Sequence, residues 1–490
     1  MDIRKKVKYI DYLALVSIGI FCLLYSIFYS NFAKLHINFK FLPFPVFVGE
    51  ILLAFCLVLL VIKWSILKIK FNFYHFILFI FIGFILFKAI FGYFKWGALA
   101  FRNSALFYYP LFALIGYYFY NRDIFNLIWI KIFLILILSI SAFLKIPQDY
   151  YLFTYCLLIA VLSYKLPYKY LRWIGILMAI IIFLKSDLFN QTKGMLVSIL
   201  IAILYLVFCL WFWVKKIKFL RYLYFLIGVG AIVIILIFSL NPSTIKRISV
   251  WAKWDNLVSE IRYHSQYANK EIDYKPKEFV VVKLYEENIP KQGIITSKPE
   301  IVSSKPEITT SKSEITTSKP GTKNFKLRSG DEDLYNILWR IFVWKDMFRE
   351  IIKEKAIFGL DFGKPFRSLT LEKLRDIEGT RWCIGDLIGW LEPHNSYIHI
   401  LYRAGIVGLF FIIAVWVMFI KIVFRFIRKI NFIGILLTCA LLYWLILGNF
   451  IVLLELPYFA ILFWSLYGIV LAYSCKKNKI EFRDATKEDG

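Results

Sequence analysis

His394 and His399 are two of the five histidines in the chain, and both lie in the polar stretch 393–403, directly before an apolar segment. A neutral imidazole can accept a proton from a hydroxyl group near pH 7. If the stretch is helical from about Asn395, His394 stands just before the helix, where backbone N–H groups are free, and His399 shares a face with Arg403 at i, i+4. His394 is the candidate general base, with Asn395, His399 and Arg403 as supporting residues. The alternative is that His394 only caps the helix.

Basic side chains occupy the ends of several other helix-forming segments. Arg102 lies just before one apolar segment, Lys193 lies at the mouth of another, and Arg340 lies on an amphipathic stretch. Cations at the mouth of a helix bundle suit a phosphate or pyrophosphate group. The alternative is snorkelling, in which a long side chain reaches the lipid headgroup layer. Snorkelling is the better explanation for three other lysines, Lys88, Lys131 and Lys185.

Other candidate sites are weaker. The segment Gly359–Lys364 resembles a phosphate-binding loop, but it is one residue short and Pro365 follows it, so we expect no nucleotide site there. The carboxylates that could replace His394 as a base are Asp361, Asp386 and Glu392. The spacing of His and Cys matches no zinc site, so neither a metal nor another cofactor is expected.

The composition requires a membrane protein. Sixty per cent of the residues are hydrophobic and 19% are charged, and the mean hydropathy is +0.67. A soluble domain is about half apolar and about a quarter charged. The net charge of +27 would suggest a nucleic-acid partner in a soluble protein. Here no nucleic-acid motif is present, and Lys and Arg gather in alternate short loops, as the positive-inside rule describes. We therefore expect an all-α polytopic membrane protein with both termini cytoplasmic and no nucleic-acid partner.

The hydropathy pattern divides the chain into spans and one large outer loop. A span needs about 20 apolar residues, and about twelve such runs are present, at 9–29, 44–64, 73–94, 104–121, 124–146, 148–165, 169–187, 194–214, 218–240, 404–426, 431–448 and 453–474. Nine spans are thus expected in 1–240, an outer loop in 241–403, three spans in 404–474 and a cytoplasmic tail in 475–490. Of the seven cysteines only Cys383 should face outward, so no disulfide is expected.

The outer loop has three parts. Residues 297–323 repeat a seven-residue motif of Ser, Lys, Pro, Glu and Thr that cannot bury a core, which predicts a disordered tether. Residues 334–353 place apolar side chains at helical spacing beside Trp and basic residues, which predicts an interfacial helix on the outer leaflet. The stretch 393–403 then leads into the membrane.

The sequence PHNSYIHILYRAGIVGLF at 393–410 resembles the signature of the superfamily of O-antigen ligases and O-antigen polymerases, which are bacterial envelope glycosyltransferases. Residues 340–363 resemble the family's Arg-x-x-x-Trp helix and the Gly-x-x-x-Gly-type turn after it. Residues 190–206 resemble its Ser-Arg-Gly entry into a span. The layout of about twelve spans with one large outer loop late in the chain is also similar to that of the family.

The resemblance implies a GT-C-like fold that moves a glycan from an undecaprenyl-pyrophosphate carrier to an acceptor hydroxyl at the periplasmic face of the bacterial inner membrane. It implies no need for metal or ATP, because the carrier phosphate is the leaving group. His394 would be the general base or the residue that orients the acceptor, and Arg340 would bind the pyrophosphate and stabilise its developing charge. Lys193 stands where the family usually has arginine, and a lysine lacks the bidentate fork. Either the pyrophosphate is held less specifically at this point, or another basic residue supplies the fork, such as Arg102, which stands at a second position similar to the family's.

Several functions remain open within and outside this chemistry. The first is a ligase whose acceptor is the lipid A core. The others with the same chemistry are an O-antigen polymerase and a protein O-oligosaccharyltransferase. A different class is a transporter or flippase for lipid-linked sugars, which would place polar sites near the bilayer midplane and show repeated groups of spans. The sequence shows no such repeat. We expect its polar residues at the outer face of the membrane, in contact with membrane lipids, and not at the midplane where a transporter would place them.

Overall fold

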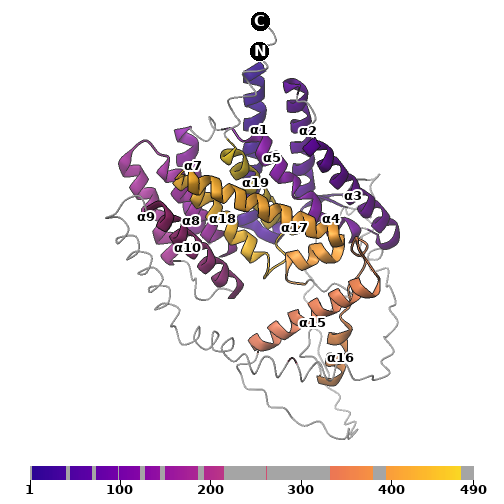
Figure 1. The fold of residues 1–490 in the computed structure, drawn as a ribbon. Coiled ribbons are helices and arrows are strands. Elements are labelled where there is room, and N and C mark those ends of the chain that lie inside the picture. The colour runs from indigo at the N-terminus through magenta and orange to yellow at the C-terminus, as the bar shows by residue number, and fades with distance from the viewer. Residues whose placement is uncertain are drawn as a thin grey trace, which may run out of the picture.

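The computed structural model describes residues 3–39, 45–68, 73–97, 99–121, 127–143, 149–185, 193–214, 261, 332–378 and 393–475. Most of these residues are helical (Figure 1). The helices are α1 (Ile3–Ala33), α2 (Val48–Leu67), α3 (Phe73–Trp96), α4 (Leu99–Tyr108), α5 (Leu111–Phe119), α7 (Ile128–Phe143), α8 (Asp149–Tyr164), α9 (Lys169–Lys185), α10 (Lys193–Val214), α15 (Glu332–Lys353), α16 (Leu369–Glu378), α17 (Ser396–Arg428), α18 (Phe432–Leu447) and α19 (Pro457–Ser474). A two-stranded antiparallel ladder, β1 (His36–Ile37) and β2 (Val46–Phe47), joins α1 to α2.

The chain is a membrane-embedded, all-α protein, as its composition predicts. Five helices in the described ranges are long and apolar enough to cross a membrane, namely Lys5–Ala33, Val48–Leu67, Phe79–Trp96, Ser396–Arg428 and Pro457–Ser474. Four further apolar helices are shorter, Ile128–Phe143, Tyr150–Tyr164, Gly194–Cys209 and Phe432–Leu447. The predicted span 218–240, the predicted tether 297–323 and the residues Cys383, Asp386 and Glu392 lie outside the described residues.

Two predicted spans differ from the observed helices. The segment 104–121 is divided between α4 and α5 at Pro110, because a proline has no N–H group to continue a helical hydrogen-bond ladder. The segment 404–426 belongs to a longer helix, since α17 begins at Ser396. This helix is kinked at Gly405, whose φ is 52°.

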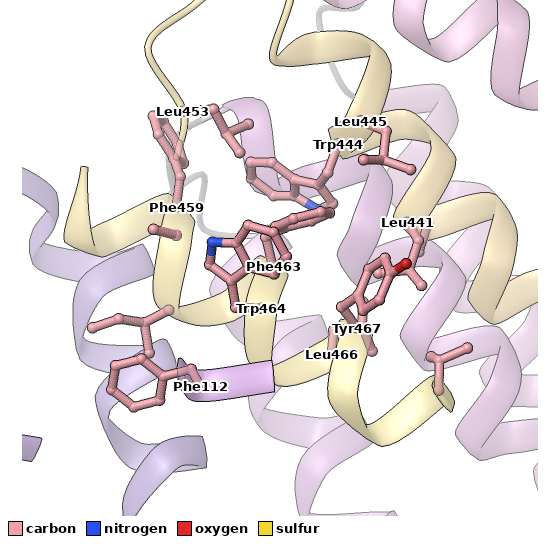
Figure 2. Close-up of a cluster of buried hydrophobic side chains, with 14 of the residues drawn as sticks. Phe112, Leu441, Trp444, Leu445, Leu453, Phe459, Phe463, Trp464, Leu466 and Tyr467 are labelled. Atoms are coloured by element: carbon pink, nitrogen blue, oxygen red, sulfur yellow. The ribbon is translucent and has the colours of Figure 1, made fainter. Parts of the chain in front are cut away.

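The core of the membrane region is centred on α18 and α19. Buried side chains from these two helices meet Phe112 of α5 and Leu453 of the connecting loop (Figure 2). Trp444 of α18 is fully buried, and its Nε1 donates a hydrogen bond to the Thr154 hydroxyl of α8 at 2.7 Å. α19 packs along α5, and α18 packs against both α8 and α10. The last two helices therefore hold the N-terminal helices together.

α15 and α16 form a separate lobe below the membrane helices in Figure 1. Asp346 of α15 fixes the start of α16, because its carboxylate accepts hydrogen bonds from the Ser368 hydroxyl at 2.6 Å and the Thr370 N–H at 2.9 Å. A second apolar cluster lies in this lobe and includes Tyr402 of α17; its other members are Leu338, Phe342, Val343, Met347, Leu360, Phe366, Leu371 and Leu374.

This cluster includes part of the apolar stripe in 334–353. The helix is present, and Leu338 and Phe342 of its stripe are fully buried against protein side chains. Only the later part of the stripe is open to lipid or water, as Phe348 is 43% and Ile352 is 75% exposed. A helical repeat alone does not tell a lipid-facing stripe from one that another helix covers.

Candidate functional site at the start of α17

His394 lies directly before α17 and does not cap it. The cap is Asn395, whose side-chain oxygen accepts hydrogen bonds from the N–H groups of Tyr397 and Ile398, both at 3.0 Å. An asparagine in this position satisfies N–H groups that a helix leaves unpaired at its start. The helix does begin where the sequence predicted, and the capping role considered for His394 belongs to its neighbour.

The backbone at His394 is held in an uncommon conformation. Its φ is 48°, in the left-handed region that few residues other than glycine adopt. A conformation of this kind costs about 1–3 kcal/mol and persists where the surrounding structure imposes it, most often at functional sites. One contact that imposes it is the hydrogen bond from Trp344 Nε1 to the Pro393 carbonyl, at 2.7 Å. α15 therefore fixes the chain immediately before the histidine.

The imidazole of His394 packs on α15. Its ring centroid lies 5.3 Å from that of Trp339, with the two planes inclined at 56°. The side chain is half-buried. Burial lowers the pKa of His394 below its ordinary value, and the positive charge of Arg340 lowers it further. The imidazole is therefore neutral near pH 7, with one ring nitrogen able to accept a proton.

Arg340 brings a fixed positive charge to the same place. It follows Trp339 on α15, is half-buried, and interacts electrostatically with both His394 and Tyr150 at the start of α8. Burial lowers the pKa of Arg340 and Tyr150 opposes this effect, but an arginine remains protonated at physiological pH. The structure thus brings together the two residues that the sequence singled out for catalysis.

A second polar group lies one turn further along α17. His399 Nδ1 is 3.0 Å from Glu455 Oε2, although the two atoms are not aligned as a hydrogen bond. Arg403 Nε donates to His399 Nε2 at 3.4 Å, so the predicted i, i+4 pair is confirmed. All three side chains are buried. Burial by itself would raise the pKa of Glu455, but His399, Arg102 and Arg403 together hold it below its ordinary value.

Glu455 is not among the residues that the sequence predicted to be functional. It lies in the loop between α18 and α19, inside the predicted span 453–474. It is the only Asp or Glu in the apolar stretch from residue 431 to residue 474. A lone carboxylate in such a stretch indicates a buried partner or a functional role, and this signal could have drawn attention to it.

Arg102 belongs to the second polar group. It is an exposed residue of α4, yet its charge is close enough to Glu455 to lower the pKa of that carboxyl. The next residue, Asn103, accepts a hydrogen bond from the Gly363 N–H through its side-chain oxygen at 2.8 Å. α4 is thus fastened to the segment that follows α15, and the predicted cation lies near Glu455.

Lys193 is the first residue of α10, and its side chain lies outside the described part of the structure. The adjacent Gly194 packs on Phe450 in the loop between α18 and α19. Ser396, the first residue of α17, binds this same loop through its N–H to the Gly448 carbonyl at 2.8 Å, and Leu453 N–H donates to its hydroxyl at 2.8 Å. The backbone of Lys193 therefore adjoins the loop that supports α17.

Other predicted side chains have structural partners. Asp361 forms an ion pair with Lys95 at 3.1 Å, and Lys364 pairs with Glu350 at 2.7 Å and also with Glu354. These pairings agree with the expectation that Gly359–Lys364 is not a phosphate loop.

The snorkelling explanation for Lys88 is wrong. Lys88 is only 8% exposed and its ammonium group binds backbone carbonyls inside the protein. Lys131, for which the same explanation was given, is also buried, and it donates to the Lys165 carbonyl at 3.1 Å. Lys185 has its side chain outside the described residues.

Within the described ranges, no three His, Cys, Asp or Glu side chains are grouped as metal ligands would be. The site is instead a neutral histidine beside arginines, at the junction between the α15 lobe and a membrane helix. Comparisons of the chain with models of known protein families and with curated proteins find no match.

Proposed function

We propose that this chain is a metal-independent glycosyltransferase of the O-antigen ligase type. It would transfer a glycan from undecaprenyl pyrophosphate to a hydroxyl of the lipid A core, at the periplasmic face of a bacterial inner membrane. The observation that carries the proposal is the pair formed by His394 and Arg340, a neutral base and a fixed cation held together by α15 at the entrance to α17. The twelve-span, GT-C-like layout and the cytoplasmic position of both termini are parts of the same proposal.

The two residues of this pair can each serve one half of a transfer reaction: His394 the attack by the acceptor hydroxyl, and Arg340 the departure of the pyrophosphate. An acceptor hydroxyl oxygen attacks the anomeric carbon of the donor glycan, and the bond from that carbon to the pyrophosphate oxygen breaks. The hydroxyl proton passes to the neutral His394, which its lowered pKa keeps ready to accept it. The pyrophosphate leaves with the electron pair, and Arg340 stabilises the charge that develops on it.

Two further basic residues fit the same leaving group. A pyrophosphate carries several negative oxygens, which one guanidinium cannot pair in full. Arg102 lies on α4 next to the Glu455 group, and Lys193 starts the helix that packs on the loop holding Ser396. In this proposal Arg102 supplies the bidentate fork that Lys193 lacks. His399 and Arg403, which are both buried, support the start of α17 and do not touch the donor.

The proposal is tested with the full chain in lipid nanodiscs, supplied with an undecaprenyl-pyrophosphate-linked oligosaccharide and purified lipid A core. The measured product is glycan bound to the core, together with released undecaprenyl pyrophosphate. The informative variant is His394→Asn, because asparagine tolerates a positive φ and therefore removes the imidazole without adding backbone strain. We expect a loss of at least about 100-fold in rate. The matched control is His36→Asn, since His36 is an exposed histidine of β1.

The same assay examines Arg340. Replacement by alanine should lower the rate by about 100-fold or more, while Arg340→Lys keeps the charge and should lose less. The control is Arg349→Ala on the same helix, whose side chain is 54% exposed. Normal transfer by either His394→Asn or Arg340→Ala would refute the assignment of that residue. Failure of the unaltered chain to consume the donor with any acceptor would refute the proposed function.

The identity of the acceptor and the class of function are determined from the envelope glycans of cells that lack the protein. Long glycan stranded on the carrier beside bare lipid A core indicates a ligase, and single repeat units on the carrier indicate a polymerase. Normal envelope glycan with unglycosylated envelope proteins indicates a protein O-oligosaccharyltransferase. Donor that crosses a vesicle membrane with its glycan still attached indicates a transporter.

A further inference from the structure

The segment 356–363, which joins α15 to the residues before α16, runs alongside the membrane helix α3. Its residues meet α3 at successively deeper positions. The contacts, in order, are Gly363 against Trp96, the Phe362 carbonyl against Gly92, and Phe358 against Phe84 at a ring distance of 6.4 Å. The turn therefore does not rest on the end of α3 but descends along its side.

The depth of this descent follows from helix geometry. From Trp96 to Phe84 a helix rises roughly 18 Å at about 1.5 Å per residue. The hydrocarbon core of a bilayer is about 30 Å thick. Because α3 is one of the five helices able to cross a membrane, the tip of the turn lies at hydrocarbon depth.

A non-helical backbone at that depth needs internal partners for its polar groups, and the carbonyls of residues 356–361 all have one. Lys88 Nζ donates to the carbonyls of Phe358 at 2.7 Å, Gly359 at 3.1 Å and Leu360 at 3.1 Å. Three further bonds connect the turn to α17, with Arg403 Nη1 donating to the Asp361 carbonyl at 2.8 Å, Ile406 N–H to the Ile357 carbonyl at 2.9 Å, and Leu360 N–H to the Tyr402 carbonyl at 2.8 Å.

Lys88 and the kink of α17 make this arrangement possible. A lysine inside a span is costly unless it is paired or bound by carbonyls, and Lys88 is bound by the turn and by the Arg403 carbonyl at 2.6 Å. Gly405 has a φ of 52°, and a Cβ atom there would collide with the Ile357 carbonyl. The carbonyls of the turn supply acceptors for the buried ammonium group of Lys88, and Lys88 supplies donors for those carbonyls. Each therefore stabilises the other.

The tip of the turn is apolar and uncovered. Ile357 is 66% and Phe358 is 59% exposed. Exposed apolar side chains also lie on the two membrane helices that the turn contacts, including Phe87 of α3 at 67% and Phe410 of α17 at 64%. An apolar tip that packs on two membrane helices at this depth is covered by the same lipid as those helices.

We propose that residues 356–363 form a re-entrant turn, anchored from within by Lys88, whose tip contacts the acyl chains of the bilayer through Ile357 and Phe358. The turn couples the α15 lobe, which carries Arg340, to the membrane interior. The inference does not depend on the glycosyltransferase proposal, since it rests on contacts and burial alone.

The test is the reactivity of cysteines introduced at the tip. Ile357→Cys and Phe358→Cys are prepared in the full chain, reconstituted in phosphatidylethanolamine–phosphatidylglycerol vesicles, and treated with a charged methanethiosulfonate loaded on both sides by freezing and thawing. The reagent needs a thiolate in water. The control is Lys353→Cys at the end of α15, and the labelling of the seven native cysteines is subtracted.

We expect Ile357→Cys and Phe358→Cys to react at least about tenfold more slowly than Lys353→Cys. Equal rates would place the tip in water and overturn the proposal. Adding Lys88→Met should raise the labelling at residue 357 or prevent accumulation of the protein in the membrane. The comparison change Lys95→Met removes a half-exposed lysine of the same helix that pairs with Asp361 at the surface end of the turn. Because an exposed ion pair contributes little to stability, this change should alter neither the labelling nor the accumulation by much. Unchanged protection in stable Lys88→Met protein would refute the anchoring role of Lys88.

Discussion

Replacing Glu455 by glutamine tests whether the buried polar group stabilises the start of α17. The side chain of Glu455 is 3% exposed and that of His399 is 6% exposed. The charges of Arg102 and Arg403 also act on the carboxylate. Glutamine keeps the shape and one oxygen acceptor but removes the charge, which leaves the two arginines without their shared counter-ion.

The expected magnitude follows from burial. Breaking a buried ion pair by removing one partner costs about 3–5 kcal/mol, and we expect Glu455→Gln to fall near the low end because an acceptor remains. The matched control is Glu354→Gln. Glu354 pairs with Lys364 but its side chain is 42% exposed, so its loss should cost about 0–1 kcal/mol.

The assay is unfolding by SDS in mixed micelles, followed by tryptophan fluorescence, for the parent and both variants. The pH dependence gives an independent check. Because the pKa of Glu455 is lower in the folded protein than in the unfolded chain, its stabilising contribution is complete above the unfolded pKa of about 4.3 and is lost as the pH falls through the folded value. The difference between parent and Glu455→Gln should therefore shrink as the pH falls below about 4. A Glu455→Gln protein as stable as Glu354→Gln at pH 7 would show that the buried group contributes nothing to stability.

Four other predictions concern the same region. The lowered pKa of His394 implies that transfer is lost only as the pH falls below its ordinary value of about 6.5, so a pH–rate profile with its acidic midpoint above 7 would contradict a neutral base. Asn395→Ala removes the acceptor for two N–H groups at the start of α17 and should destabilise the protein by about 1 kcal/mol in the same unfolding assay. Gly405→Ala introduces a Cβ at a φ of 52° against the Ile357 carbonyl, and we expect greatly reduced accumulation in membrane fractions, where wild-type levels would show that the kink is not required. Deletion of 297–323 should leave both accumulation and transfer unchanged, and loss of transfer would show that these residues are more than a tether.

Local features of the site could be predicted from sequence because they depend on neighbours along the chain. The start of a helix at about Asn395 and the pairing of His399 with Arg403 follow from the 3.6-residue repeat, and the structure confirms both. The position of His394 immediately before that helix follows as well. What the short-range pattern could not decide was whether His394 or Asn395 fills the capping role.

The partners that come from distant segments could not be predicted. Glu455 approaches His399, and Arg340 approaches His394 and Tyr150, only because helices far apart in sequence pack together. Lys88 looked like a snorkelling lysine, since its sequence neighbours are all apolar and its carbonyl partners lie in residues 358–360 and 403. The apolar stripe of α15 was likewise ambiguous.

The sequence by itself determined that the chain is an all-α membrane protein. The free energy of placing so many apolar residues in water excludes a soluble protein, and apolar runs of about 20 residues match the length of a spanning helix. The sequence also determined which polar residues stand at the ends of apolar segments. Only the tertiary structure decided which of these polar groups meet, and which apolar faces are covered by protein. Both kinds of contact depend on packing between elements that no local repeat specifies.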